Sequence, residues 1–149
     1  MDPFTRFREY AATFEEVVKT DDWSLLEPYF AEDAVYEIIG GEPFGGLHEG
    51  RDAILAHMKR SLDGFDRRFG TRQLEILEGP ALNEGAVWFR WRITYVSEGL
   101  PELVIDGQES VTIEDDRIVR LEDRFPPQMS GITQAWFNAY GDKLPPAGR

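Results

Sequence analysis

Two carboxylates occupy positions where an alternating strand pattern calls for apolar residues. Glu109 and Asp123 lie in consecutive segments that each read as a β-strand. The other residues predicted to point inward are apolar: Ile105, Val111 and Ile113 in the first segment, and Val119, Leu121 and Phe125 in the second. Because strand side chains alternate between two faces, both carboxylates should also point inward. If the turn at 115–117 has three residues, they lie directly opposite each other.

Two carboxylates facing each other among aromatic residues cannot both ionise cheaply. Burial and mutual repulsion should raise the pKa of at least one of them. A carboxyl group of this kind can give or take a proton near neutral pH. An inward carboxylate near an open end could instead contact water, Arg51, Arg72 or the first amides of a helix. The presence of two such residues, Glu109 and Asp123, favours the acid–base interpretation.

Three further side chains are candidates for the same site. Tyr36 could aim its hydroxyl inward as a donor, although a core tyrosine with its hydroxyl at the rim shows the same pattern. His48 lies in a Gly-rich loop that could border a pocket mouth, and His57 follows an apolar helical position and is expected to be partly exposed. No spacing of His, Asp and Glu matches a metal site, and the chain has no cysteine. We therefore expect neither a metal nor a cofactor.

The first 65 residues read as helices interrupted by one strand. Apolar residues recur at steps of three and four in three stretches, and this spacing predicts three helices. The stretches are Phe4, Phe7, Ala11, Phe14 and Val18; Trp23, Leu26 and Phe30; and Ile54, Leu55, Met58, Leu62 and Phe65. Pro28 should make the second helix short or bent. Residues 34–39 favour a strand, and the dense Gly and Pro of 40–46 favour a loop.

The second half reads as four antiparallel strands and a final helix. The strands are predicted at 72–78, 86–96, 103–113 and 118–125, separated by turn residues such as Gly79-Pro80, and the helix at 131–144. Helices first and a curled sheet afterwards indicate one α+β domain over 1–149. The expected architecture is a conical antiparallel or mixed sheet wrapped around the N-terminal helices, a cystatin-like α+β barrel.

Alternation within the strands divides their residues between a pocket and an outer face. The predicted pocket residues are Phe14, Tyr36, Ile38, His48, Phe89, Trp91, Ile93 and Trp136. Trp88, Arg90 and Arg92 belong to the outer face, which is either solvated or a polar interface between two copies. We expect a homodimer that uses this face, because tryptophan and arginine are frequent at interfaces.

Composition limits the classes of partner. The chain has 149 residues and a net charge of -12, with no basic patch that would attract nucleic acid. No apolar run reaches the roughly 20 residues of a membrane-spanning helix, and residues 1–4 do not resemble the start of a signal peptide. These features predict a cytoplasmic protein that contacts neither nucleic acid nor membrane. Its partner should be a small hydrophobic molecule or a second copy of the chain.

Two passages resemble the nuclear transport factor 2-like superfamily, which includes SnoaL-like polyketide cyclases, limonene epoxide hydrolase and ketosteroid isomerase. The first combines residues 29–37 with 50–53, and the second is Ile118-Val119-Arg120-Leu121-Glu122-Asp123-Arg124-Phe125. By element order the resemblance covers nearly the whole chain. It implies a hollow cone built around a small apolar ligand.

The resemblance to limonene epoxide hydrolase is incomplete at the residue level. The catalytic aspartate of that enzyme falls on Asp123 and its water-positioning tyrosine on Tyr36. Its asparagine falls on Ile38, and its arginine and second aspartate fall on Trp91 and Ile93. The epoxide hydrolase mechanism is therefore not assembled in this sequence.

Ketosteroid isomerase gives an equally partial match. The protonated carboxyl of its oxyanion hole falls on Glu109, its general base on Ile38 and its tyrosine donor on Phe14. SnoaL-like cyclases use a carboxylate near the end of the last strand, for which Asp123 is the counterpart. The expected activity is carboxylate-mediated proton transfer of the isomerase, cyclase or hydrolase type, with Asp123, Glu109 and Tyr36 as catalytic residues. The alternative is a non-catalytic ligand-binding or dimerisation module.

Overall fold

The structure is a computed structural model that describes residues 2–42 and 45–146. Its α-helices are α1 (Pro3–Thr20), α2 (Arg51–Gly64) and α3 (Met129–Tyr140), and its 3-10 helices are η1 (Trp23–Tyr29), η2 (Asp66–Arg68) and η3 (Gly141–Lys143). Its strands are β1 (Phe30–Ile39), β2 (Gly46–Glu49), β3 (Thr71–Asn83), β4 (Ala86–Val96), β5 (Leu103–Glu114) and β6 (Arg117–Arg124). This confirms the α+β class expected from the sequence.

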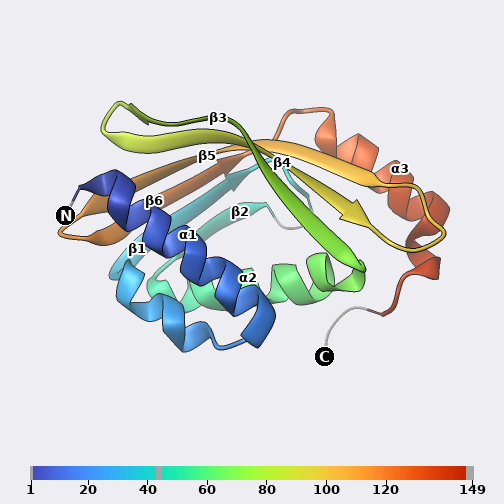
Figure 1. The fold of residues 1–149 in the computed structure, drawn as a ribbon, viewed down its shortest axis with the longest axis horizontal. Helices are drawn as coiled ribbons and strands as arrows, with labels where there is room; N and C mark the ends of the chain where they lie inside the picture. The colour runs from blue at the N-terminus through green and yellow to red at the C-terminus, as the bar shows by residue number, and fades with distance from the viewer. Residues whose placement is uncertain (1, 43–44, 147–149) are drawn as a thin grey trace.

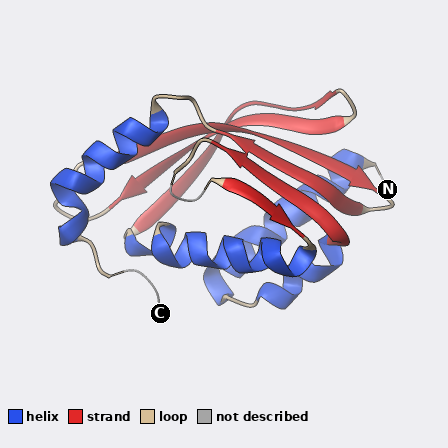
Figure 2. Ribbon diagram, turned by 180° about the vertical axis from the view of Figure 1, so that it is seen from behind, coloured by secondary structure: helices blue, strands red, loops and turns tan. Residues whose placement is uncertain are grey.

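The six strands form one mixed sheet in the order β2-β1-β6-β5-β4-β3. The pairing of β1 with β6 is parallel, and the other neighbours are antiparallel. The sheet curls without closing, so that β2 and β3 are its edges. Helices α1 and α2 lie beneath its concave face, and α3 lies at one end (Figures 1 and 2). This arrangement creates the space in which inward side chains of the sheet meet the helices.

Local signals in the sequence define both ends of α1. The Asp2 side chain accepts a hydrogen bond from the Thr5 amide at 3.0 Å, and proline occupies the first turn. At the other end Asp21 adopts a left-handed conformation and donates its amide to the Val17 carbonyl. The buried face of the helix consists of Phe7, Tyr10 and Val17. It is therefore rotated slightly from the predicted stripe, which contained Val18 instead of Val17 and omitted Tyr10.

The connection between β5 and β6 sets the register of the two central carboxylates. Asp115 and Asp116 form a two-residue turn with φ values of 51° and 62°. A bulge then adds one residue to β6, so that Glu109 lies directly opposite Asp123. The bulge also changes which residue points inward: Ile118 is 1% exposed, whereas Val119 is only partly buried. The inward placement predicted for Val119 was wrong for this reason.

Two predicted connections are part of the sheet. Strand β3 continues through Gly79-Pro80 with register shifts on both sides, so these residues are not a turn between strands. Part of the expected 40–46 loop is described, and Gly46 already begins β2, which pairs with β1. Pro43 and Phe44 lie outside the described residues. As expected, the segment containing Pro28 is short, and it is a 3-10 helix.

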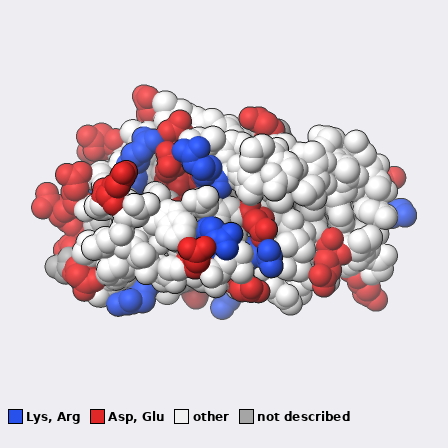
Figure 3. Space-filling view, turned by 90° about the horizontal axis from the view of Figure 1, so that it is seen from above, with Lys and Arg blue, Asp and Glu red and all other residues white. Residues whose placement is uncertain are grey.

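The outer face of the sheet carries charges that are paired within the chain (Figure 3). Strand β4 alternates buried and half-buried residues along its whole length, which confirms that Arg90 and Arg92 point outward. Arg90 pairs with Glu78 at 2.9 Å and Arg92 with Asp106 at 2.6 Å. The Trp88 indole donates to Gln108 at 3.0 Å. Among the described helices, none is long and apolar enough to cross a membrane.

Candidate functional site

A cavity of about 300 Å³ lies between the concave face of the sheet and the helices. Its walls are mainly aromatic and aliphatic, and the aromatic residues are Phe7, Tyr10, Phe14, Tyr36, Phe65, Phe89, Trp91, Tyr95 and Phe125. The Trp91 ring lies over Gly107, where an added Cβ would come within 2.4 Å of the indole. The exposed lining residues Glu42 and Leu74 mark the open side of the cavity. Its size is at the lower end of small-molecule sites in proteins.

The two inward carboxylates meet in the wall of this cavity. Glu109 and Asp123 are direct cross-strand partners, and Asp123 is only 7% exposed. The Tyr36 hydroxyl donates a short hydrogen bond to Asp123 Oδ2. Asp123 Oδ1 is buried and, within the described part of the chain, has no hydrogen-bond partner of good geometry. The structure therefore brings Tyr36, Glu109 and Asp123 together.

Burial controls the protonation of the pair. It raises the pKa of Glu109 well above its normal value, and the charge of Asp123 raises it further. Burial also raises the pKa of Asp123, but hydrogen bonding from Glu109 and Tyr36 opposes that rise. The pKa of Tyr36 is well raised by burial and then by the Asp123 charge, which keeps the phenol a neutral donor. At intermediate pH one proton is therefore shared, with Glu109 the more protonated member.

The alternative of an ion-paired carboxylate does not match the geometry. Within the described residues, no lysine or arginine lies within ion-pair distance of Glu109 or Asp123. Arg51 lies 3.9 Å from Asp52, and its Nε is buried without a hydrogen-bond partner in the described part of the chain. Arg72 is bonded to other carboxylates. The carboxyl pair thus depends on Tyr36 and on its shared proton.

Tyr10 is a cavity residue that the sequence reasoning missed. It projects from α1, is 5% exposed and lines the cavity. Its pKa is raised well above normal by burial first, then by the charges of Glu109 and Asp123. A second neutral phenol therefore lies close to the carboxyl pair. The spacing of Phe7, Tyr10, Phe14 and Val17, in steps of three and four, was the signal that could have identified it.

The two histidines are placed differently from the prediction. His57 is 5% exposed and lines the cavity, so its expected partial exposure was wrong. His48 lies on the edge strand β2, not in a loop, and it is absent from the described cavity lining. The two rings stack with centroids 3.8 Å apart, and the His57 ring lies 5.9 Å from that of Tyr36. Burial, followed by the charges of His48 and Arg60, lowers the His57 pKa to about 4, which keeps it neutral at pH 7.

A second polar cluster lines another part of the cavity. Arg72 donates to Asp66 at 2.9 Å and to Glu15 at 3.0 Å, and the Tyr95 hydroxyl donates to Asp66 at 3.1 Å. Burial raises the pKa of Asp66 even though the Arg72 charge and these hydrogen bonds act to lower it. The cluster ties α1, η2, β3 and β4 together at this side of the cavity.

Most of the predicted pocket residues face the cavity. Phe14, Ile38, Phe89, Trp91 and Ile93 line it. Trp136 does not: it packs on Phe69 at 5.3 Å between ring centroids, and its indole donates to the Pro101 carbonyl at 3.1 Å. Its placement in the pocket was wrong because α3 lies at the end of the sheet (Figure 1).

The sequence matches the family model of the SnoaL-like domain over residues 8–121. The chain belongs to the SnoaL-like domain family. The match includes Tyr36 and Glu109 and ends two residues before Asp123. No curated protein sequence matches this SnoaL-like chain significantly.

Solved structures with the same fold have low sequence identity to this SnoaL-like protein. A candidate isomerase from Bacillus subtilis has a TM-score of 0.68 and 17% identity, covering 93% of this chain and 96% of its own. A candidate polyketide cyclase from Xanthomonas campestris has a TM-score of 0.59 and 19% identity, and the match covers 89% of this chain and 98% of the cyclase chain. An NTF2-like protein from Burkholderia xenovorans has a TM-score of 0.61 and 16% identity, and the match covers 89% of this chain and 96% of the neighbour's chain. These similarities establish the NTF2-like fold, also described as cystatin-like.

Proposed function

We propose that this SnoaL-like protein binds a small hydrophobic molecule in its cavity and catalyses carboxylate-mediated proton transfer on it. The observation that carries the proposal is the buried Glu109–Asp123 pair, held by the Tyr36 hydroxyl in an aromatic wall. Two carboxyl groups with raised pKa values provide an acid and a base close together. The candidate isomerase and candidate polyketide cyclase among the structural neighbours are consistent with this class of reaction.

The proposed roles follow from the protonation of the pair. Asp123 is the better base, because hydrogen bonding to its carboxylate opposes the effect of burial. Its Oδ1, which accepts no hydrogen bond of good geometry from the described residues, takes a proton from a carbon next to a carbonyl group. Protonated Glu109 donates to the oxygen on which negative charge develops, and Tyr36 holds Asp123 in position. The step needs no cofactor, and both isomerisation and aldol-type cyclisation begin in this way.

A non-catalytic ligand-binding module is the second candidate. Apolar side chains favour it: Ile38, Trp91 and Ile93 line the cavity beside the carboxyl pair. By the resemblance described above, limonene epoxide hydrolase has catalytic polar residues at these three positions, and ketosteroid isomerase has its general base at the first of them. In such a module the pair would orient a ligand without chemistry.

Deuterium exchange separates the two candidates. We expect the protein to accelerate exchange at the α-carbon of small aromatic ketones in D₂O, measured by NMR, by about 10²-fold or more over buffer. The double variant Glu109→Gln/Asp123→Asn should lose this acceleration. A matched variant, Glu98→Gln/Glu102→Gln, removes the same charges from exposed positions and should retain it. Ketones that quench the tryptophan fluorescence of the protein without exchanging would reject catalysis in favour of binding alone.

We also propose a homodimer formed through the outer face of the sheet. Trp88 and Arg90 are available there, although Arg90 already pairs with Glu78 of the same chain. Dimerisation would therefore exchange or extend existing ion pairs, and it should weaken at high salt. Light scattering at high protein concentration should give about twice the chain mass of 17.1 kDa. A mass of one chain at every concentration would refute the dimer.

A further inference from the structure

The cavity has a strong imbalance of charge. Among its described lining residues, five carry carboxyl groups, namely Glu15, Glu42, Asp66, Glu109 and Asp123, and Arg72 alone carries a permanent positive charge. The Arg72 guanidinium is bonded to both Asp66 and Glu15. His57 remains neutral at pH 7 because burial lowers its pKa to about 4. The described lining therefore offers no cation to the Glu109–Asp123 pair, whose single shared proton leaves it with negative charge at intermediate pH.

Asp123 provides an independent indication of what the ligand supplies. Its side chain is more than nine-tenths buried and lines the cavity, and its Oδ1 makes no hydrogen bond of good geometry in the described residues, although Glu109 lies directly opposite. Buried acceptor oxygens nearly always have a donor, since leaving one unpaired is costly. The proton shared with Glu109 is the donor that the protein itself supplies, and a cationic group of a ligand could serve this oxygen more directly.

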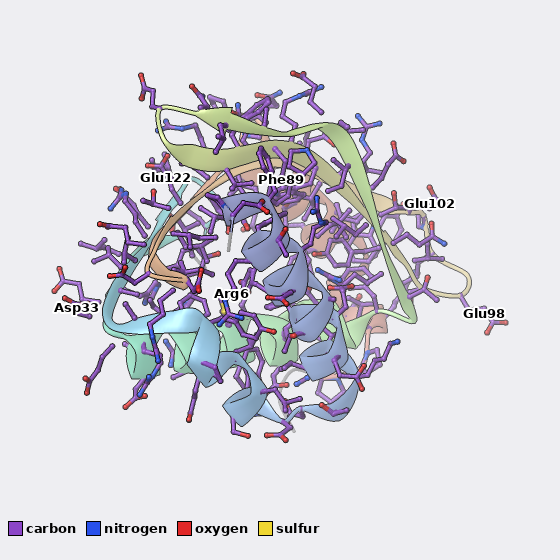
Figure 4. All side chains as sticks on the ribbon, turned by 60° about the vertical axis from the view of Figure 1, so that its left-hand side comes forward. Arg6, Asp33, Phe89, Glu98, Glu102 and Glu122 are labelled. Atoms are coloured by element: carbon purple, nitrogen blue, oxygen red, sulfur yellow. The ribbon has the colours of Figure 1, made fainter. Side chains whose placement is uncertain are left out.

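The walls beside the pair suit a cation. The rings of Phe7 and Phe89 lie 5.1 Å apart, and those of Trp91 and Phe125 lie 5.5 Å apart at an angle of 84°. Phe89 projects into the space between the sheet and α1 (Figure 4). Faces of aromatic rings attract ammonium groups, most strongly where water is excluded. The net charge of -12 would also steer a cation toward the protein.

We propose that the ligand of this cavity is a hydrophobic amine whose protonated nitrogen lies against the Glu109–Asp123 pair. An ammonium N–H donates to Asp123 Oδ1, and the ammonium charge neutralises the one negative charge of the pair that shares a proton. The apolar body of the amine lies among Phe7, Phe89 and Trp91. The inference rests on the proposed function only in placing the ligand in this cavity, and it holds whether or not the protein is a catalyst.

The direction of the pH effect distinguishes an amine from a neutral ligand. Titratable groups face the cavity from every element around the pair, and these are Tyr10 and Glu15 of α1, Tyr36 of β1, Glu42, His57 of α2, Asp66 of η2, Arg72 of β3, Tyr95 of β4, Glu109 of β5 and Asp123 of β6. An ammonium group binds best to the ionised pair, so its affinity should rise with pH until the amine loses its own proton near pH 10. A neutral acceptor needs protonated Glu109 and should bind more weakly over the same range.

Calorimetric titration with three matched probes tests the proposal. Naphthyl-ethylamine, naphthyl-ethanol and naphthyl-acetate share one hydrophobic body and differ in charge. At about pH 7.5 we expect the amine to bind at least tenfold more tightly than the alcohol, a difference of about 1.4 kcal/mol, and the acetate to bind most weakly. The amine affinity should fall at about pH 5.5. An alcohol that binds as tightly as the amine, or an amine affinity that does not change with pH, would overturn the inference.

Paired variants show whether the carboxyl pair is responsible. Glu109→Gln/Asp123→Asn should remove the preference for the amine, whereas Glu98→Gln/Glu102→Gln should preserve it. Glu98 and Glu102 point away from the cavity (Figure 4). If the Glu109→Gln/Asp123→Asn variant still prefers the amine to the alcohol, the proposed location of the amine is refuted. If that variant does not fold, the pH dependence of amine binding to the unchanged protein decides the inference. Exchange on neutral ketones without an amine preference would reject the amine and leave the proposed function intact. A preference for the amine without exchange on ketones would reject the proposed catalysis and leave the amine inference intact.

Discussion

The variant Asp123→Asn is expected to lose proton transfer while gaining stability at neutral pH. Removal of the base should lower the exchange rate of a ketone substrate by about 10²- to 10⁴-fold. Asparagine keeps an oxygen that can accept the Tyr36 hydroxyl hydrogen bond but removes the like charge beside Glu109. Burial raises the pKa of both carboxyl groups, so their ionisation opposes folding. A variant with opposite effects on activity and stability is typical of a functional site.

The gain in stability should depend on pH with a defined sign. Below about pH 3 both carboxyls are protonated in the folded and the unfolded chain, and the pair has little effect through ionisation. Above that pH the unfolded chain releases these protons first, so the free energy of unfolding falls as the pH rises through the raised folded pKa values. Each unit of raised pKa corresponds to about 1.4 kcal/mol. Urea unfolding at about pH 3 and pH 7.5 should therefore show the advantage of Asp123→Asn only at the higher pH.

A matched substitution on the outer face provides the control. Asp106 pairs with Arg92 at 2.6 Å and is partly exposed. The change Asp106→Asn should cost less than about 1 kcal/mol at neutral pH, since exposed ion pairs contribute little. If Asp123→Asn instead lowers the stability at pH 7.5, the Asp123 carboxylate is stabilised by contacts that the acid–base proposal does not include.

Arg72→Met is expected to be the most destabilising single change at the cavity. Asp66 and Arg72 have side chains only 12% and 15% exposed, and their atoms lie 2.9 Å apart. Methionine preserves much of the packing but leaves the Asp66 carboxylate without its cation. Breaking a buried pair in this way costs about 3–5 kcal/mol. Because burial already raises the Asp66 pKa, protonation of Asp66 should relieve the loss, which should therefore be smaller at acidic pH.

Two comparisons test the cause of that loss in urea unfolding experiments. The double variant Arg72→Met/Asp66→Asn should recover part of the lost stability, because the two positions are in contact and their effects do not add. Arg90→Met, which breaks an exposed pair with Glu78, should cost less than about 1 kcal/mol. A double variant as unstable as the sum of the single changes would contradict the role of an unpaired Asp66 charge.

The sequence predicted five of the six strands and the carboxyl pair, because these depend on a strong period of two. Strand β4 was predicted with the bounds that the structure shows, and Glu109 and Asp123 face each other as expected. The predicted register assumed a three-residue turn. The structure reaches the same register with a two-residue turn and a bulge. Because of the bulge, Ile118 points inward instead of the predicted Val119. Alternation alone cannot locate a single inserted residue.

The errors concern positions at which tertiary contacts override a local pattern. Strand β2 has only four residues and follows a Gly-rich stretch, so it depends on pairing with β1 for its formation. His57 is buried because the imidazole of His48, on β2, stacks over it, and a missed β2 meant a missed contact. Trp136 lies on a predicted apolar helix face, but only the position of α3 at the end of the sheet determined what that face would contact.

The parallel pairing of β1 with β6 places constraints on the order of folding. Tyr36 and Asp123 are separated by 87 positions in the chain, and their strands are neighbours in the middle of the sheet. Closing so long a loop costs entropy before any contact stabilises it, which slows folding. During synthesis, α1, β1 and α2 emerge long before β6, so that one edge of β1 has no strand partner until β6 has been made. The contact of Tyr36 with Asp123 is therefore made in one of the last steps, whereas the Glu109–Asp123 pair lies on a hairpin that closes no long loop. A chain that ends before β6 lacks both.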